Sequence, residues 1–261
     1  MIDSHSHIYC SDFDTDRDEA MQRAQQAGVW HIVMPNENLA SVPVLRATHE
    51  RYPTLTSMAL GLHPEDVDAH WREVLDQMRP MLDSGDFIAV GEIGIDLYWD
   101  KTYRDEQMLA LDTQLRWCQE KDLPFIMHCR NGMDEIIEVL DGLDGTMPRG
   151  VFHCFGGDEH DVERLRERGD FYFGIGGVVT FKKSTLPLLL PTIGLERILL
   201  ETDAPYMSPV PHRGTRNESS NIPYINDFIA KTLNVTPAKV SQVTDENAIK
   251  LFGLKFFNIN H

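Results

Sequence analysis

Long apolar runs are absent from this sequence of 261 residues, and no stretch approaches the ~20 apolar residues that a membrane-spanning helix needs. The N-terminal segment Met1–His5 has neither a basic region nor an apolar core, so we expect no signal peptide. The 4 cysteines include no C-x-x-C pair and are too few for a disulfide scaffold. These absences predict a cytoplasmic protein with reduced thiols and no membrane partner.

Basic residues are also scarce. Lys and Arg number 24 against 41 Asp and Glu, which gives a formal net charge of −17. Proteins that coat nucleic acid non-specifically neutralise phosphates with Lys and Arg, so the composition disfavours that class. It remains compatible with a local basic mouth, or with metal ions that supply the positive charge.

Short apolar runs alternate with amphipathic segments along the chain. The candidate strands are Met1–His7, His31–Pro35, Thr56–Leu62, Phe87–Ile95, Pro124–Cys129, Gly150–Cys154, Phe171–Gly176 and Arg197–Thr202. The candidate helices between them are Thr15–Ala27, Leu39–Arg51, Glu65–Ser84, Tyr103–Lys121, Met133–Gly142, Glu159–Arg168, Ser184–Leu190 and Ile222–Leu233. Two further short helices are expected within Thr236–Phe252.

The alternation of strands and helices predicts the fold class. Runs such as Phe87–Val90 are continuously apolar, which suits parallel strands that are buried on both faces. Eight successive strand–helix units predict an α/β protein with a (β/α)₈ TIM barrel, with an open doubly wound sheet as the alternative. About 250 residues are typical of such a barrel, and no linker divides the chain. We therefore expect a single domain over residues 1–261.

Residues that can bind metals fall at the C-terminal ends of the predicted strands, where barrel enzymes place their active sites. They are His5 and His7 on the first strand, His63 on the third, Glu92 on the fourth, His128 on the fifth, His153 on the sixth and Asp203 on the eighth. His5 and His7 share one strand face because they are two residues apart. Glu92 interrupts an apolar strand and needs a partner, either in a salt bridge or as a ligand that bridges two cations.

Each strand-end histidine, taken alone, fits a structural hydrogen bond as well as a metal ligand. The predicted barrel favours metal ligands over structural hydrogen bonds, because it brings all of these residues to one face of the fold without further assumptions. Imidazole and carboxylate ligands suit Zn²⁺, Mn²⁺, Fe²⁺ and Co²⁺ about equally, so the residues do not identify the metal.

Several motifs together resemble the TatD family of metal-dependent deoxyribonucleases. They are His5-Ser6-His7, Gly61-Leu62-His63-Pro64, Gly91-Glu92-Ile93-Gly94-Ile95-Asp96, His128-Cys129-Arg130, His153-Cys154-Phe155, Glu201-Thr202-Asp203-Ala204-Pro205 and Arg213-Gly214-Thr215-Arg216-Asn217-Glu218. They occur in the family's order and span nearly the whole chain. The resemblance implies an amidohydrolase-type barrel that hydrolyses phosphodiester bonds in DNA, often as a 3′-to-5′ exonuclease. The expected partner is a nucleic acid, single-stranded DNA.

The resemblance also implies which residues form the site. The cofactors would be two divalent metal ions, with zinc, magnesium and manganese as candidates. Their ligands would be His5, His7, Glu92, His128, His153 and Asp203. His63 and Arg130 become candidates for contact with a substrate phosphate.

We assign provisional roles within this set. One metal would be held by His5, His7 and Asp203, the other by His128 and His153, with Glu92 between them. Asp203 is also a candidate general base for the attacking water, which makes Asp203 and Glu92 the catalytic candidates. Glu201, two residues before Asp203, is expected to support a metal ligand from behind.

Two arginines in the long loop after the eighth strand have open roles. Many barrels bind phosphate in this region, so Arg213 and Arg216 are candidates for substrate contact. Anchoring of the loop by a salt bridge, for example with Glu218, is an equally good interpretation.

Two other functions fit the same motifs. A barrel hydrolase acting on a small-molecule ester, amide or phosphoester would use the same metals, and the acidic charge favours it. Arg130 and the arginines after the eighth strand favour a phosphate-bearing substrate instead. A non-catalytic protein would be expected to have lost at least one ligand, whereas the ligand set here is complete.

Overall fold

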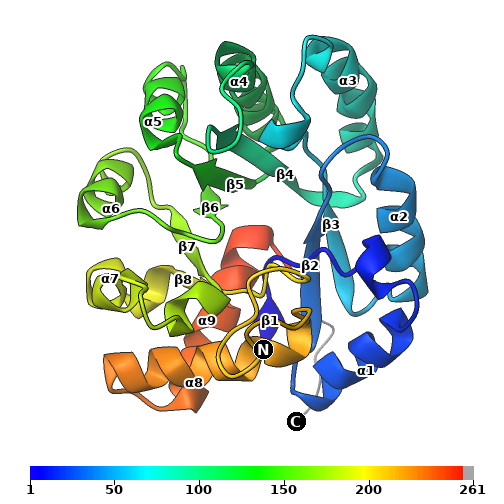
Figure 1. Ribbon diagram of the computed structural model, residues 1–261. Coiled ribbons are helices and arrows are strands. Elements are labelled where there is room, and N and C mark those ends of the chain that lie inside the picture. The colour runs from blue at the N-terminus through cyan, green and yellow to red at the C-terminus, as the bar shows by residue number, and fades with distance from the viewer. Residues whose placement is uncertain (255–261) are drawn as a thin grey trace.

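The computed structural model of the protein describes residues 1–254. Eight parallel strands, paired in chain order, curve into a barrel that is surrounded by helices (Figure 1). The strands are β1 (Ile2–Asp3), β2 (His31–Pro35), β3 (Thr56–Ala59), β4 (Phe87–Asp96), β5 (Phe125–Arg130), β6 (Gly150–Phe152), β7 (Tyr172–Ile175) and β8 (Ile198–Leu200). The α-helices are α1 (Arg17–Gln26), α2 (Val42–Arg51), α3 (Trp71–Met78), α4 (Arg104–Lys121), α5 (Met133–Asp141), α6 (Glu159–Arg166), α7 (Leu186–Ile193), α8 (Ile222–Leu233) and α9 (Pro237–Phe252).

Backbone hydrogen bonds join the first and last strands. The N–H of Ser4 donates to the carbonyl oxygen of Leu200 at 2.9 Å, and the N–H of His7 donates to that of Ala204 at 2.7 Å. The N–H of Asp203 donates to the carbonyl oxygen of His5 at 2.9 Å. This closure places the His5–His7 segment directly beside Asp203, although nearly 200 residues separate them in the chain.

One apolar side chain from each strand enters a common cluster in the barrel interior. These residues are Ile2, Val33, Ala59, Ala89, Ile126, Val151, Tyr172 and Leu199. Ala248, Leu251 and Phe252 of α9 pack against the same cluster. The C-terminal helix therefore covers one end of the barrel, and the site can form only at the opposite end, where the strands finish.

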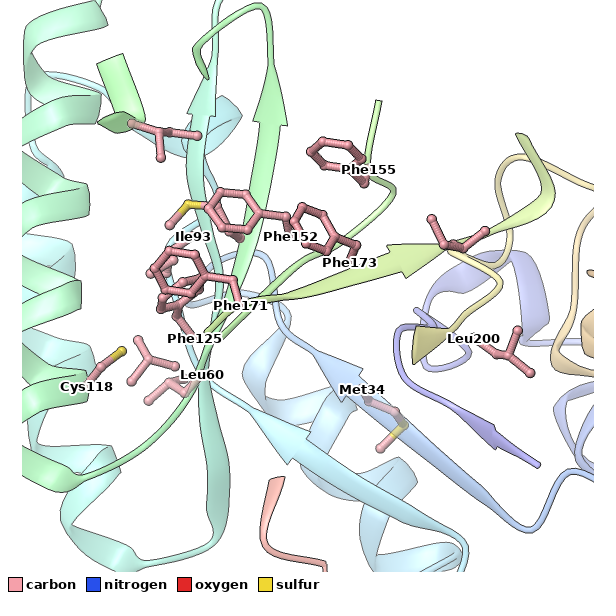
Figure 2. Close-up of a cluster of buried hydrophobic side chains, with 14 of the residues drawn as sticks. Met34, Leu60, Ile93, Cys118, Phe125, Phe152, Phe155, Phe171, Phe173 and Leu200 are labelled. Atoms are coloured by element: carbon pink, nitrogen blue, oxygen red, sulfur yellow. The ribbon is translucent and has the colours of Figure 1, made fainter. Parts of the chain in front are cut away.

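A second and larger apolar cluster lies between the barrel wall and the surrounding helices. Figure 2 shows Phe125, Phe152, Phe171 and Phe173 gathered in this layer, with Cys118 of α4 facing them. The rings of Phe125 and Phe152 meet edge to face, with centroids 5.8 Å apart. Strand residues thus alternate between two apolar environments, which explains why the strands read as continuous apolar runs.

The strand β4 loses its regular register where it carries Glu92. Ala89 belongs to the inner cluster, whereas Val90 and Ile93 both belong to the outer one, and the pairing with β5 shifts between Val90 and Ile93. Such an irregularity re-aims a side chain, and here it turns Glu92 toward the barrel interior. A Cβ atom on Gly94 would lie 1.9 Å from the carbonyl oxygen of His128, so only glycine allows β4 and β5 to approach so closely.

The predicted barrel is confirmed, and three details of the sequence interpretation are wrong. β1 is shorter than Met1–His7, because the backbone beyond Asp3 bonds to the segment after β8. Glu65–Ser84 is not one helix, since α3 is flanked by two 3₁₀ turns and Pro80 lies just after its end. Thr236–Phe252 holds one helix, not two, with the Thr236 side chain capping its first turn. Within the described residues, no helix combines the length and apolarity needed to cross a membrane.

The loop that follows β8 is anchored to α1 by ion pairs. Arg216 donates to both carboxylate oxygens of Asp16, at 2.6 and 2.8 Å, and Arg23 of α1 bonds to Asp16 and to Glu218. The guanidiniums of Arg216 and Arg23 hold the pKa of Asp16 well below its usual range. Loop anchoring, one of the two roles considered for Arg216, is therefore the role that its contacts show.

We predict that Asp16→Asn lowers the free energy of unfolding at pH 7 by on the order of 1 kcal/mol, because it removes the carboxylate that both arginines share. A depressed carboxylate pKa contributes stability above the unfolded-state value of about 3.9, and this contribution is lost as the pH falls through the folded-state value. Urea titrations should therefore show a larger difference between variant and wild type at pH 7 than at pH 3. Asp76→Asn, at an exposed position on α3, is the control. An equal difference at both pH values would contradict this account.

Candidate metal centre

A single carboxylate lies at the centre of the site. Glu92 is 2% exposed, and its two oxygens face imidazole nitrogens from four different strand ends. Its Oε1 lies 2.7 Å from His153 Nε2, 3.1 Å from His128 Nδ1 and 3.2 Å from His63 Nε2. Its Oε2 lies 3.2 Å from His5 Nε2 and 3.4 Å from His7 Nε2. All the strand-end histidines that the sequence singled out therefore converge on Glu92.

Asp203 completes one side of this cluster. Its Oδ1 lies 3.6 Å from His5 Nε2 and 3.7 Å from His7 Nε2, and its side chain is 13% exposed. The imidazole of His153 stacks on that of His5 with ring centroids 3.8 Å apart. The close packing leaves Asp203 as the carboxylate of the cluster that is open to the barrel mouth.

The spacing of these atoms fits metal ions better than hydrogen bonds alone. His5 Nε2 lies 3.1 Å from His7 Nε2 while also facing carboxylate oxygens of Glu92 and Asp203. A neutral imidazole has one N–H and one lone pair, so it cannot satisfy all of these neighbours at once. A divalent cation attracts nitrogen lone pairs and carboxylate oxygens alike. The donor set is therefore suited to a metal.

Three sets of ligand atoms are tight enough to hold an ion. The atoms of each set lie within 4.8 Å of one another, and the sets are His5 with Glu92 and His153, His5 with His7 and Asp203, and His63 with Glu92 and His128. The second set matches the sequence hypothesis for one metal. The third contains His63, which the sequence had assigned to substrate contact, and whose Nε2 is as near to Glu92 as the other nitrogens are.

The charge of Glu92 shapes the protonation of the cluster. Burial raises the pKa of Glu92, but the surrounding histidines, His153 first, outweigh burial and hold it well below its usual range. Burial lowers the pKa of His7, but its hydrogen bond to Glu92 and the negative charge nearby outweigh burial and raise the pKa to about 9. Burial, with a smaller contribution from the charge of Glu92, raises the pKa of Asp203, although His153 and His7 oppose the rise.

Asp96 supports the cluster from outside and was given no role from the sequence. Its Oδ2 lies 2.8 Å from His128 Nε2, so His128 faces Glu92 with one ring nitrogen and Asp96 with the other. Burial lowers the pKa of His128, but the hydrogen bonds that His128 donates to Asp96 and Glu92 outweigh burial and raise it to about 9. A carboxylate behind a ligand histidine fixes its orientation and tautomer. The signal in the sequence was the even spacing of Glu92 and Asp96 at the end of one strand.

Tyr9 orients His7 in the way that Asp96 orients His128. Its hydroxyl lies 3.1 Å from His7 Nδ1, and the side chain is buried. This contact fixes the ring of His7 so that Nε2 faces Glu92. No feature of the sequence distinguished Tyr9 from an apolar core residue.

Glu201 is buried directly behind His153. Its Oε1 accepts a hydrogen bond from the N–H of Cys154 and lies 3.9 Å from His153 Nδ1. Burial, reinforced by the charge of Asp203, raises the pKa of Glu201 well above its usual range. Gly174 makes room for this side chain, since a Cβ atom there would lie 2.0 Å from Glu201 Oε2. Glu201 therefore bonds to the backbone beside His153, and its support of a metal ligand stays a prediction.

Two arginines of the expected set lie at the rim, outside the cluster. The guanidinium of Arg130 lies 3.8 Å from the ring centroid of Tyr98, just after β4. The guanidinium of Arg213 lies 3.6 Å from the ring centroid of Phe181. Both contacts are with aromatic faces, and neither arginine has a carboxylate partner among the ion pairs found in residues 1–254.

Comparison with known proteins places this geometry in a family. The family model described as TatD related DNase matches residues 2–253. The chain belongs to this family. The TatD resemblance predicted from the motifs is thereby confirmed, and with it the assignment to metal-dependent hydrolases.

Individual relatives span the same length as this TatD-family chain. It is 32% identical over 253 residues to the uncharacterized metal-dependent hydrolase YabD of Bacillus subtilis, covering 97% of this chain and 98% of that protein. It is 35% identical over 258 residues to the 3′-5′ ssDNA/RNA exonuclease TatD of Cronobacter sakazakii, covering 97% of each. The crystal structure of the TatD homologue YJJV from Escherichia coli K12 superposes with a TM-score of 0.90 at 31% identity, covering 98% of each chain.

We predict that metal binding by this TatD-family protein releases protons. His7 and His128 have pKa values of about 9 without metal, so both hold protons at neutral pH that a metal must displace. Metal affinity should therefore rise between about pH 6 and pH 9, with release of up to about two protons per molecule at neutral pH. Calorimetric titration in buffers of different ionisation enthalpy measures this number. His128→Asn should release fewer protons, and binding without proton release in the wild type would contradict the prediction.

Proposed function

We propose that this protein is a divalent-metal-dependent exonuclease that hydrolyses phosphodiester bonds of single-stranded DNA from the 3′ end. The observation that carries the proposal is the convergence of five imidazoles and Asp203 around the buried Glu92 at the open end of the barrel. The relative from Cronobacter sakazakii, which is 35% identical over nearly the whole chain, is named as an exonuclease of single-stranded DNA and RNA.

The proposed centre holds two metal ions, with zinc, magnesium and manganese as candidates. His5, His7 and Asp203 would hold one ion, His128 and His153 the other, and Glu92 would face both through its two oxygens. When bound, such ions supply positive charge for a phosphate oxygen and make water acidic enough to act at neutral pH. His63 lies close enough to Glu92 to serve either as a further ligand or, as first predicted, as a phosphate contact.

The chain's own residues then direct the hydrolysis. Asp203 is the proposed general base, because it is open to the mouth and its raised pKa suits proton uptake. The attacking water gives a proton to Asp203 as its oxygen bonds to phosphorus, and the ester bond to the departing sugar oxygen breaks. Asp203 then returns this proton to the departing oxygen, which leaves as a hydroxyl group. Arg130 and Arg213, at the rim, are proposed to bind phosphates, for which a planar guanidinium is well suited.

A nucleic acid substrate has to approach an acidic protein, since the formal net charge is −17. Positive charge therefore has to be local, and the metal centre with the rim arginines provides it. We also propose a cytoplasmic location. The four cysteines, all within the described residues, are free thiols, as expected in a reducing compartment.

We predict that Glu92→Gln lowers turnover at least about 100-fold, because it removes the charge that holds the histidines together. The assay uses a 5′-labelled single-stranded oligonucleotide with Mg²⁺, Mn²⁺ or Zn²⁺, and EDTA as the blank. Glu196→Gln, an exposed glutamate outside the site, is the matched control and should cleave normally. A circular single strand should resist cleavage by an exonuclease.

Two results would separate the parts of this proposal. Full activity of Glu92→Gln with metal bound would remove Glu92 from the centre. No cleavage by a folded, metal-loaded wild type would overturn the nuclease assignment and favour a small-molecule substrate for the same centre. Cleavage of RNA in the same assay would widen the substrate class beyond DNA.

We further predict that Asp203→Asn lowers kcat by roughly 10²- to 10⁴-fold, the usual contribution of a general base. The amide keeps the size of the side chain but cannot take up the proton. Metal content measured beside the kinetics distinguishes the roles, because loss of a ligand lowers occupancy whereas loss of a base leaves it unchanged. Near-normal kcat with normal metal content would exclude Asp203 as the base.

A further inference from the structure

Two aromatic side chains stand exposed at the rim of the metal centre. Trp99 is 75% exposed and Tyr98 50%, and both follow directly after β4, which carries Glu92. Of the three other tryptophans, Trp71 is 4% and Trp117 is 7% exposed, and Trp30 is half-buried. Two adjacent aromatic rings that are open to water beside the metal centre form an apolar patch that is suited to ligand contact.

A fixed cation holds these rings in place. The guanidinium of Arg130 lies 3.8 Å from the ring centroid of Tyr98 and 5.4 Å from that of Trp99. The two rings meet edge to face, with centroids 4.6 Å apart and planes at 88°. Arg130 pairs in register with Asp96 across β4 and β5. The aromatic pair is therefore tied to the strands that bear the metal ligands.

A cavity of about 220 Å³ opens beside the exposed indole. Its apolar wall consists of Trp99, Tyr103, Pro64 and Val67, and its polar side of Gln107 and the carboxylates of Glu65, Asp96 and Asp100. The volume lies below the range of about 300–1,000 Å³ that is typical of drug-sized ligands, so it suits a single ring system. Asp96 also bonds to His128, so one residue links this cavity to the metal centre.

We propose that Trp99 and Tyr98, backed by Arg130, form a stacking platform for a nucleobase of the single-stranded substrate. The platform depends on the proposed function, since it would bind the strand whose phosphate lies at the metals. Unpaired bases offer an open π-face to an indole, whereas the bases of a duplex are already stacked and paired. Stacking needs no excess of basic residues, which is consistent with the formal charge of −17. It also predicts tolerance of base sequence, because every base has a π-face.

The test measures binding without turnover. The metal-loaded protein is titrated with a phosphorothioate oligothymidylate, which resists hydrolysis, and with an abasic strand of the same length and linkage. Fluorescence reports contact at Trp99, because Trp71 and Trp117 are buried and Trp30 is half-buried, bonded to Asp245 of α9 at the other end of the barrel. Trp99→Ala and Trp99→Phe are compared with Leu188→Ala, which truncates a side chain that is 78% exposed on α7.

Base stacking on an aromatic side chain predicts that Trp99→Ala weakens oligothymidylate binding about 5- to 100-fold. Trp99→Phe should retain most of the affinity, and Leu188→Ala should bind like the wild type. The wild type should bind the abasic strand more weakly by a similar factor, and Trp99→Ala should hardly distinguish the two strands. Quenching of indole fluorescence by oligothymidylate should exceed quenching by the abasic strand.

The binding and cleavage experiments together distinguish an error in the proposed platform from an error in the proposed function. Equal affinity of the wild type for both strands, or full affinity in Trp99→Ala, overturns the platform even if the nuclease assay succeeds. Strong base-dependent binding without any cleavage leaves the platform standing and overturns the exonuclease. Absence of binding to either strand by the metal-loaded wild type overturns the platform as well.

Discussion

Burial of one negative charge is the constraint on which the site depends. Glu92 is almost completely buried inside the barrel, and an uncompensated carboxylate there would be costly. Imidazoles from four other strand ends offset this cost, and each of them must lie level with Glu92 along the barrel axis. The same neighbours that make the charge tolerable are the proposed metal ligands. Stability of the barrel mouth and the capacity to bind metal are therefore set by one group of contacts.

The supporting residues fall into an inner and an outer ring around this charge. The inner ring holds the imidazoles and Asp203, while Asp96, Tyr9 and Glu201 lie behind them. Each residue of the outer ring reaches a ligand or its neighbouring backbone, so the ligand geometry is built before a metal binds. Because these side chains are already ordered, they lose little conformational entropy when a metal binds. Arg130 joins the outer ring to the exposed rim.

Much of this organisation could be predicted from the sequence. The strand–helix alternation indicated the barrel, and polar residues at strand ends indicated the converging histidines and Glu92. What the periodicity could not show is the irregular register in β4, since a regular strand with Ala89 inside would turn Glu92 away from the interior. Asp96 and Tyr9 were also missed, because their roles depend on ring orientation rather than on spacing. The single helix α9 was misread because short helical stripes do not reveal where one helix ends.

The helix α9 limits the side from which a substrate can reach the metal centre. Apolar side chains from all eight strands fill the barrel interior, and Leu251 and Phe252 cover the end where the strands begin, so the metal centre is reached from one side only. A polymer cannot thread through the barrel, so only a chain terminus or a short stretch can dip into the mouth. In the proposed exonuclease, a released nucleotide would leave by the same opening that admits the strand.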